Sequence, residues 1–170
     1  MSIKLFSILL LLILSAKSFS QDMNPFIASP DSKYYHFLPG KWYLQNEDKS
    51  LDTLNSFTIK QGVHEANFIE EWNFNKMGKS MAIRTWDKTN NKWGFVWISE
   101  NGLYQVWDSK KVEDKWYIYK WFTINGETYL SRQGFFMQPD GTVLRISEKS
   151  LDEQHWELRF KQILVKAPKK

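Results

Sequence analysis

Four turn signals separate short, aromatic-rich runs, and this spacing restricts the fold more than any other feature of the chain. The signals are Asn90-Asn91, Asn101-Gly102, Asn125-Gly126 and Pro139-Asp140-Gly141, all of which favour tight hairpins. Helical periodicity is weak throughout the segment that contains them. The pattern predicts an all-β fold: a single closed or nearly closed antiparallel up-and-down barrel of about ten strands, with a short N-terminal capping segment.

The predicted barrel covers residues 37–166, follows a leader or capping segment at 21–36, and precedes a basic tail at 167–170. Neither an internal repeat nor a linker interrupts this region, so we predict a single domain. The strands are placed between the turn residues, at 39–47, 54–61, 64–74, 79–88, 92–99, 102–110, 115–123, 127–137, 142–151 and 155–165.

Residues 1–20 have the organisation of a secretory signal peptide. A short basic start is followed by the apolar run Leu5–Ser15 and by the small-x-small site Ser18-Phe19-Ser20. The apolar run is too short to span a membrane as a helix, and a retained N-terminal anchor is the alternative. Cleavage between Ser20 and Gln21 leaves 150 residues with no further transmembrane candidate and no lipobox cysteine. We therefore expect a secreted or periplasmic protein.

The composition excludes several classes of site. The chain has no cysteine, which excludes disulfides, thiolate metal sites and a thiol nucleophile. Its three histidines are scattered, so neither a metal nor another cofactor is predicted. Loss of Lys4 and Lys17 with the signal peptide lowers the formal net charge from +4 to +2, which gives little support to nucleic-acid binding. We predict a monomer that binds a small molecule.

Because side chains alternate between the two faces of a strand, the turns also predict which residues share a face. Two-residue turns are placed at Asn90-Asn91, Glu100-Asn101, Glu113-Asp114 and Asn125-Gly126, and a type I turn with a glycine bulge at Gly141. The resulting inner face is rich in rings and carries two arginines. It consists of Arg84, Trp86, Trp93, Phe95, Trp97, Tyr104, Asp108, Tyr117, Tyr119, Trp121, Leu130, Arg132, Phe136 and Glu148.

Two further turns allow more than one register. A bulge at Gly78 places Phe68, Glu70, Trp72 and Phe74 inside the barrel, whereas its absence places Ile69, Glu71 and Asn73 there. A three-residue turn at 152–154 buries Trp156, Leu158 and Phe160, whereas a two-residue turn buries Glu157, Arg159 and Lys161. Burial of a ring is worth about 2 kcal/mol, so the first register is favoured at both turns.

Arg84 and Arg132 are the strongest candidates for ligand binding, because a guanidinium inside a barrel requires an acceptor. Their predicted protein partners are Glu70 and Glu148, respectively. Arg132 and the hydroxyl of Tyr119 are predicted to hold a carboxylate or phosphate in a bidentate clasp. The alternatives are that both arginines form purely structural ion pairs, or that the register is wrong and both lie outside the barrel.

Aromatic side chains complete the predicted site. The rings of Trp86, Trp97, Tyr104 and Trp121 are placed where they would enclose a lipid-like or aromatic molecule. The alternative is that the rings fill the barrel and leave no cavity. The predicted function is binding of a small, largely apolar ligand with an anionic or polar head group, and no catalytic residue is assigned.

Three other functions compete with this prediction. An isomerase or lyase on the same barrel would use Glu70, Asp108 or Glu148 as the base and an arginine to hold an enolate. A glycan-binding module would expose a platform of rings on the outer surface. A structural protein of the cell envelope would have a solid lumen.

The segment Leu38-Pro39-Gly40-Lys41-Trp42 resembles the Gly-x-Trp start of lipocalins and related calycin barrels. In that family the Trp packs across the closed end of the barrel against an Arg or Lys of the last strand, for which Arg159 is the candidate here. The ten short strands look closer to barrels of the fatty-acid-binding or nitrobindin type, of which the former clasp a carboxylate with an Arg-x-Tyr pair. The resemblance implies a secreted lipocalin-like domain that binds a ligand in its lumen.

Overall fold

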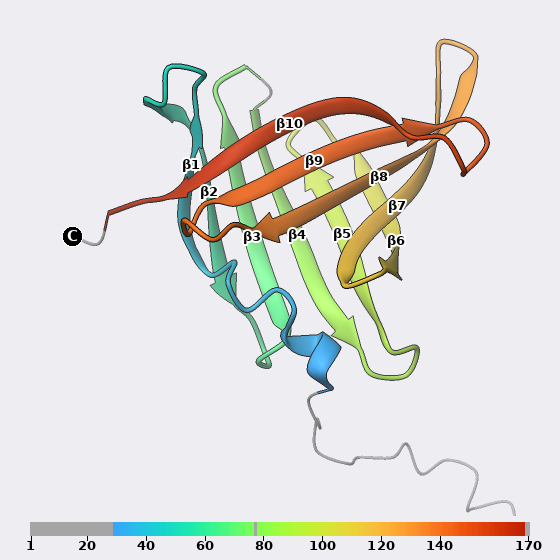
Figure 1. The fold of residues 1–170 in the computed structure, drawn as a ribbon, viewed down its shortest axis with the longest axis horizontal. Helices are drawn as coiled ribbons and strands as arrows, with labels where there is room; N and C mark the ends of the chain where they lie inside the picture. The colour runs from blue at the N-terminus through green and yellow to red at the C-terminus, as the bar shows by residue number, and fades with distance from the viewer. Residues whose placement is uncertain (1–28, 77, 169–170) are drawn as a thin grey trace, which may run out of the picture.

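The computed structural model describes residues 29–76 and 78–168, which form a closed antiparallel β-barrel (Figure 1). Ten strands follow one another in up-and-down order, and β10 pairs with β1 to close the barrel. This confirms the predicted fold class. The predicted signal peptide and residues 21–28 of the leader lie outside the described residues. The strands are β1 (Gly40–Gln45), β2 (Leu51–Gln61), β3 (Asn67–Phe74), β4 (Gly78–Asp87), β5 (Lys92–Ser99), β6 (Tyr104–Val112), β7 (Lys115–Ile124), β8 (Glu127–Met137), β9 (Val143–Ser150) and β10 (Glu157–Lys166).

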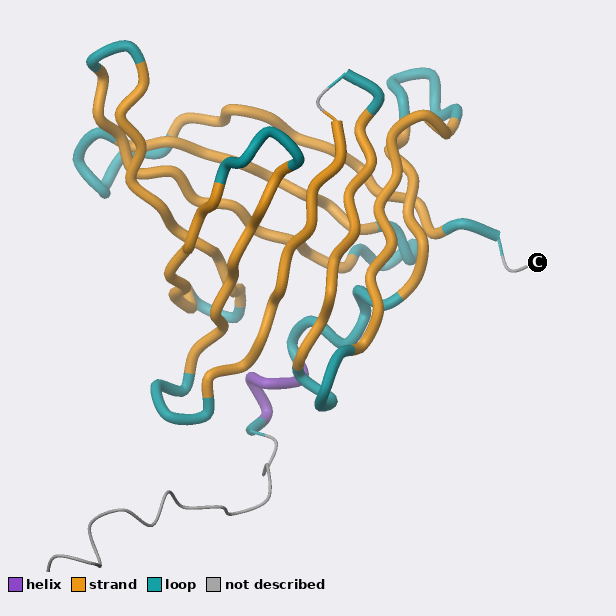
Figure 2. Tube along the Cα trace, turned by 180° about the vertical axis from the view of Figure 1, so that it is seen from behind, coloured by secondary structure: helices purple, strands orange, loops and turns teal. Residues whose placement is uncertain are grey.

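The described part of the leader closes one end of the barrel. The 3-10 helix η2 (Pro30–Lys33) begins at Ser29, whose side chain accepts a hydrogen bond from the Ser32 amide at 3.2 Å. Figure 2 shows this helix beside the loops at that end. The hydroxyl of Tyr35, in the segment that follows, donates to the Trp116 carbonyl at 3.1 Å. The closed end is packed by Tyr35, Leu38, Trp42, Ala66, Phe68, Trp86, Trp93, Trp116 and Val143.

Two of the predicted turns are confirmed in detail, whereas the predicted two-residue turn at Asn90-Asn91 is wrong, because Asp87 pairs with Lys92 across four residues. This difference of two residues leaves the faces of β4 and β5 as predicted. Asn125 and Gly126 both have positive φ, 52° and 83°, as a two-residue type I′ turn requires, and Ile124 pairs with Glu127. Gly141 has a φ of 82° and donates its amide to the Gln138 carbonyl at 3.0 Å, which makes the predicted type I turn with a glycine bulge. The predicted pairs Asp108–Tyr119, Tyr119–Arg132 and Arg132–Glu148 are all present as strand neighbours.

The turn between β5 and β6 has three residues and not the predicted two. Gly102, with a φ of 84°, donates its amide to the Ser99 carbonyl at 3.0 Å, and the Ser99 amide donates to Leu103. Trp97 therefore pairs with Gln105 instead of Tyr104. A register shift of one residue exchanges the two faces of a strand. Every prediction of an inner or outer face from β6 to β9 is consequently inverted.

The two ambiguous joins are resolved differently. Phe68, Glu70, Trp72 and Phe74 are buried, as predicted, although the pairing of β3 with β4 runs up to Phe74 and Gly78 without the predicted bulge. Between β9 and β10, the predicted register holds for Glu157 and Leu158, and a bulge then shifts it by one residue at Arg159. Leu158 is 60% exposed and Trp156 lies outside the barrel, so only Phe160 of that predicted trio faces the lumen. No helix in residues 29–76 and 78–168 is long and apolar enough to cross a membrane.

Candidate functional site

The structure divides the predicted ligand-binding residues between the two faces of the barrel. The face towards the lumen holds Glu70, Arg84, Trp86 and Trp97. The outer face holds Tyr104, Tyr119, Trp121, Arg132 and Glu148. The prediction of a single inner site is therefore wrong for this second group. Its cause is the extra residue of the β5–β6 turn, which also turns Asp108, Tyr117, Leu130 and Phe136 outwards.

Arg84 and Glu70 form the predicted ion pair inside the barrel. Both side chains are 0% exposed, and Arg84 Nε donates to Glu70 Oε1 at 2.7 Å. The guanidinium carbon of Arg84 also lies 4.5 Å from the ring centre of Tyr35 and 4.6 Å from that of Phe95. Burial acts to lower the pKa of Arg84, but Glu70 and Tyr35 together outweigh it and the pKa is raised. Arg84 therefore stays charged, and its two terminal nitrogens have no hydrogen-bond partner.

Arg145 of β9 is a second lumen arginine, and the sequence prediction placed it on the wrong face. It pairs in register with Phe135, a core residue, and its guanidinium carbon lies 4.8 Å from the ring centre of Trp72. Its terminal nitrogens donate to the side-chain oxygens of Gln162 and Gln133 at 2.9 and 3.0 Å. None of its hydrogen bonds goes to a carboxylate, and its buried Nε has no partner.

The electrostatic environment of Arg145 differs from that of Arg84. Burial lowers the pKa of Arg145 to about 10, Glu70 opposes this shift, and the positive charge of Arg84 adds to it. The two guanidiniums thus share one carboxylate in the same part of the lumen. A cation that is desolvated without a carboxylate of its own is unusual, because the Coulomb energy of a close ion pair normally offsets the desolvation cost.

The half of the lumen away from η2 is lined by partly exposed rings and polar side chains. Trp97, Phe122 and Phe160 are half-buried there. Arg159 lies among them and donates to the Ser131 hydroxyl at 3.1 Å, with its guanidinium carbon 5.3 Å from the Tyr129 ring centre. This half therefore combines apolar surface with cationic and amide groups.

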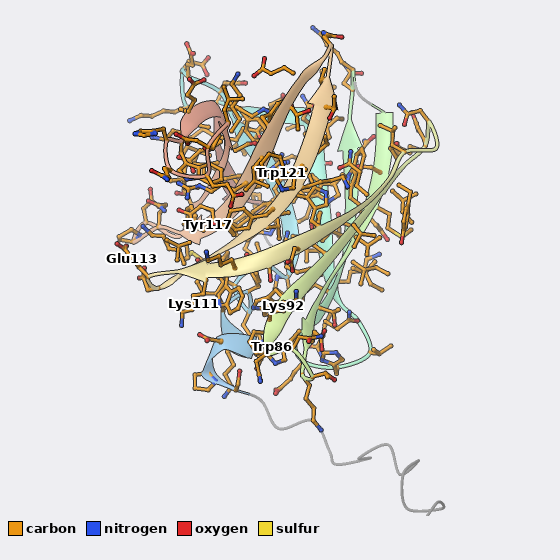
Figure 3. The ribbon with its side chains drawn as sticks, turned by 90° about the vertical axis from the view of Figure 1, so that its right-hand side faces the viewer. Trp86, Lys92, Lys111, Glu113, Tyr117 and Trp121 are labelled. Atoms are coloured by element: carbon orange, nitrogen blue, oxygen red, sulfur yellow. The ribbon has the colours of Figure 1, made fainter. Side chains whose placement is uncertain are left out.

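Arg132 forms the centre of a cluster on the outer face. Its Nε donates to Glu148 at 2.6 Å, as predicted. Its guanidinium carbon lies 4.0 Å from the ring centre of Trp156 and 4.7 Å from that of Tyr117. Figure 3 shows this side of the barrel, with Tyr117 and Trp121 labelled above Trp86, which lies at the η2 end. Arg132 is thus held by a carboxylate and two rings outside the lumen.

A groove of about 460 Å³ lies beside this cluster, a volume within the range of clefts that hold small ligands. Burial raises the pKa of Tyr119, and Arg132 opposes this shift. Lys92 donates to Asp108 at 2.5 Å and holds the pKa of that carboxyl below its usual value. The groove is lined by Asp108, Ser109, Lys110, Val112, Tyr119, Lys120, Trp121, Leu130, Arg132, Glu153 and Trp156.

A second groove, of about 570 Å³, crosses the outer face of β2 to β5. Met81 and Ile98 pair across β4 and β5 at one side of it. Glu71 lines the groove and forms a surface ion pair with Lys60 at 3.0 Å. This groove contains none of the predicted site residues.

The Gly-x-Trp segment leads into β1, and its Trp is part of the core. Trp42 is 1% exposed and donates its indole N–H to the Leu38 carbonyl at 2.7 Å. The cation over its ring is Lys166 of β10, with Nζ 5.2 Å from the ring centre. The expectation that Arg159 fills this role is wrong, because Lys166 is the residue of β10 that pairs with Trp42, and Arg159 lies near the other end of that strand.

The carboxylates proposed as catalytic bases are all ion-paired: Glu70 with Arg84, Glu148 with Arg132 and Asp108 with Lys92. Within residues 29–76 and 78–168, no three His, Asp or Glu side chains gather closely enough to hold a metal ion. Comparison with known sequences assigns no family, since no protein-family model and no curated protein matches the chain.

Proposed function

We propose that the barrel binds a small, largely apolar molecule with an anionic head group in the half of its lumen away from η2. The observation that carries this proposal is Arg145, a guanidinium inside the barrel that hydrogen bonds to two glutamines but to no carboxylate. A carboxylate or phosphate on the ligand would supply the missing negative charge. Arg145, rather than the outward-facing Arg132, is the residue that holds the head group.

The charges of the lumen support an anionic head. Arg84 and Arg145 contribute two positive charges at this level of the barrel, and Glu70 contributes one negative charge. Electrostatic interactions are stronger in a partly desolvated site than in water. An anion beside Arg145 therefore gains a favourable interaction and offsets part of the cost of burying that cation.

The rings of the lumen support an apolar body. Trp72 and Phe160 flank the Arg145 guanidinium at 4.8 and 4.9 Å, and the half-buried Trp97 and Phe122 lie nearer the open end. An apolar chain or ring placed against them would bury about 25 cal/mol per Å² of apolar surface. Apolar lining with a few placed polar groups is the usual composition of small-molecule sites.

The resemblance to calycin barrels favours the same location. Trp42 under Lys166 matches the arrangement that the resemblance implies at the closed end, and η2 with Tyr35 seals that end. The ligand would then enter from the opposite end. Export by the predicted signal peptide would place a monomeric protein in the periplasm or outside the cell, which N-terminal sequencing and light scattering of the protein from its native source would test.

The test measures binding of dodecanoate, 1-naphthoate and dodecyl phosphate by calorimetry, with dodecanol as the uncharged reference. We expect Arg145→Met to weaken binding of the anions at least tenfold and to change dodecanol binding little. Arg132→Met is the matched control, because it removes an arginine from the outer face only. Absence of binding by every anion, or equal affinities for wild type and Arg145→Met, would overturn the proposal.

The same variant separates ligand binding from a structural role. Removal of one partner of a buried ion pair destabilises a protein because the other charge is left unpaired. Arg145 hydrogen bonds to no carboxylate, so its removal leaves no such charge. Arg145→Met should therefore unfold at the same or a higher urea concentration than wild type. A large loss of stability would mean that Arg145 serves the fold.

A further inference from the structure

We infer that the outer groove beside Arg132 is a second binding site, which takes a neutral saccharide. This site lies outside the barrel and is independent of the lumen site. Sugar rings present C–H groups on their faces and hydroxyl groups at their edges. A matching protein site therefore needs an accessible aromatic face together with both hydrogen-bond donors and acceptors, and the groove provides both.

Trp121 supplies the accessible aromatic face. The residue is 50% exposed on the outer face of β7, and no aromatic ring or cationic side chain of the described residues stacks on it. The other Trp of the groove, Trp156, is already covered by the Arg132 guanidinium at 4.0 Å. The face of an indole carries partial negative charge, which attracts the weakly positive C–H groups of a sugar ring.

The polar groups of the groove favour a neutral ligand over an ion. Arg132 is paired with Glu148, and Asp108 is paired with Lys92, so these charges are balanced before any ligand binds. The remaining charged side chains of the groove, Lys110, Lys120 and Glu153, leave a net charge of only one positive unit. The groove therefore offers both hydrogen-bond donors and acceptors, and the hydroxyl of Tyr119, which interacts with Arg132, can still donate a hydrogen bond. A sugar hydroxyl also donates and accepts, so it can bond to either kind. The lumen site differs because its Arg145 lacks a carboxylate.

The wall of the groove is held in place by the loop between β9 and β10. Asp152 accepts hydrogen bonds from the His155 amide at 2.8 Å and from the Gln154 amide at 2.9 Å. Trp156, which follows, packs edge to face against Tyr119 with ring centres 6.0 Å apart. A site whose walls are fixed before binding loses less entropy when the ligand binds.

The experiment titrates the protein with soluble gluco-, xylo-, manno- and chito-oligosaccharides and with oligogalacturonate. Binding is measured by calorimetry, and the indole N–H signals are followed by NMR. We expect a neutral oligosaccharide to bind and to shift the Trp121 signal. Trp121→Ala should weaken that binding at least tenfold, and Trp121→Phe should retain most of it.

Tyr104→Ala is the matched control, since Tyr104 is 66% exposed on the same outer surface but does not line the groove. It should leave the saccharide affinity unchanged, as should Arg145→Met in the lumen. Failure of all the neutral oligosaccharides to bind would overturn the inference, as would binding of oligogalacturonate alone. Equal affinities for wild type and Trp121→Ala would also overturn it. None of these outcomes bears on anion binding in the lumen.

Discussion

Replacement of Glu70 by Gln tests whether the barrel interior contains a truly desolvated charge. The change keeps the shape of the side chain and one acceptor for Arg84 Nε, now 2.7 Å from Glu70 Oε1, but removes the negative charge. Arg84 would remain 0% exposed and charged. Breaking a buried ion pair by removing one partner costs about 3–5 kcal/mol. Because the Gln oxygen still accepts a hydrogen bond, we expect a loss of about 3 kcal/mol.

A loss of this size is a large part of the whole stability, which is about 5–15 kcal/mol for a domain. In urea, with a slope of about 2 kcal/mol per molar, the unfolding midpoint should fall by roughly 1.5 M. The assay is equilibrium urea unfolding at pH 7, followed by tryptophan fluorescence. The double variant Glu70→Gln, Arg84→Met removes both charges and should recover at least half of the loss.

Glu71→Gln is the control for this experiment. Glu71 is the next residue, points outwards and pairs with Lys60 at 3.0 Å, with the two side chains 53% and 61% exposed. An exposed pair contributes at most about 1 kcal/mol, so the midpoint should hardly change. Equal unfolding midpoints for the Glu70 and Glu71 variants would refute the assignment of a desolvated Glu70–Arg84 ion pair inside the barrel.

Three further changes test other parts of the structure. Gly134→Val should destabilise the protein by about 1–3 kcal/mol in the same urea assay, because a Cβ at this position would occupy the space of the Phe136 ring. Trp42→Ala should cost about 3–5 kcal/mol, since it empties the closed end of the barrel, and differential scanning calorimetry would show the lower Tm. A 2.6 Å hydrogen bond with Asp152 raises the pKa of His155. This interaction therefore stabilises the loop below about pH 6.5 and is lost as the pH rises through the raised pKa. In Asp152→Asn the pKa of His155 should return to its ordinary value, which an NMR titration would measure.

Much of the fold could be predicted because turn chemistry acts locally. Asn125-Gly126 and Asp140-Gly141 specify their hairpins through positive φ values that few other residues tolerate. The strand pairs across those hairpins, such as Tyr119 with Arg132, follow directly from the turn lengths. The Glu70–Arg84 ion pair was also predicted, since both residues lie on strands whose faces were assigned before the error at β5–β6.

The candidate site was predicted less well because the predicted two-residue turn at Glu100-Asn101 left out Gly102, and a glycine in this place is compatible with more than one turn length. Asn101-Gly102 closes a three-residue turn, whereas Asn125-Gly126 closes a two-residue turn. The three-residue turn at Asn101-Gly102 has the same glycine-bulge geometry as the turn at Asp140-Gly141, which was predicted correctly. The one-residue difference moved Arg145 from a predicted surface position into the lumen.

The number of strands, their order and the residue pairing from β6 to β9 follow from the amino-acid pattern, because these depend on local backbone preferences and on alternation along each strand. The predicted pairing of β4 with β5 is displaced by two residues, and that of β5 with β6 by one. Only the tertiary structure decided which face of β6 to β9 is enclosed. That choice depends on how ten twisted strands close on one another and on which rings then pack together. From the sequence pattern alone, the face that carries Arg132 and the face that carries Arg145 were equally plausible interiors. Closure of the barrel placed the face of Arg145 inside.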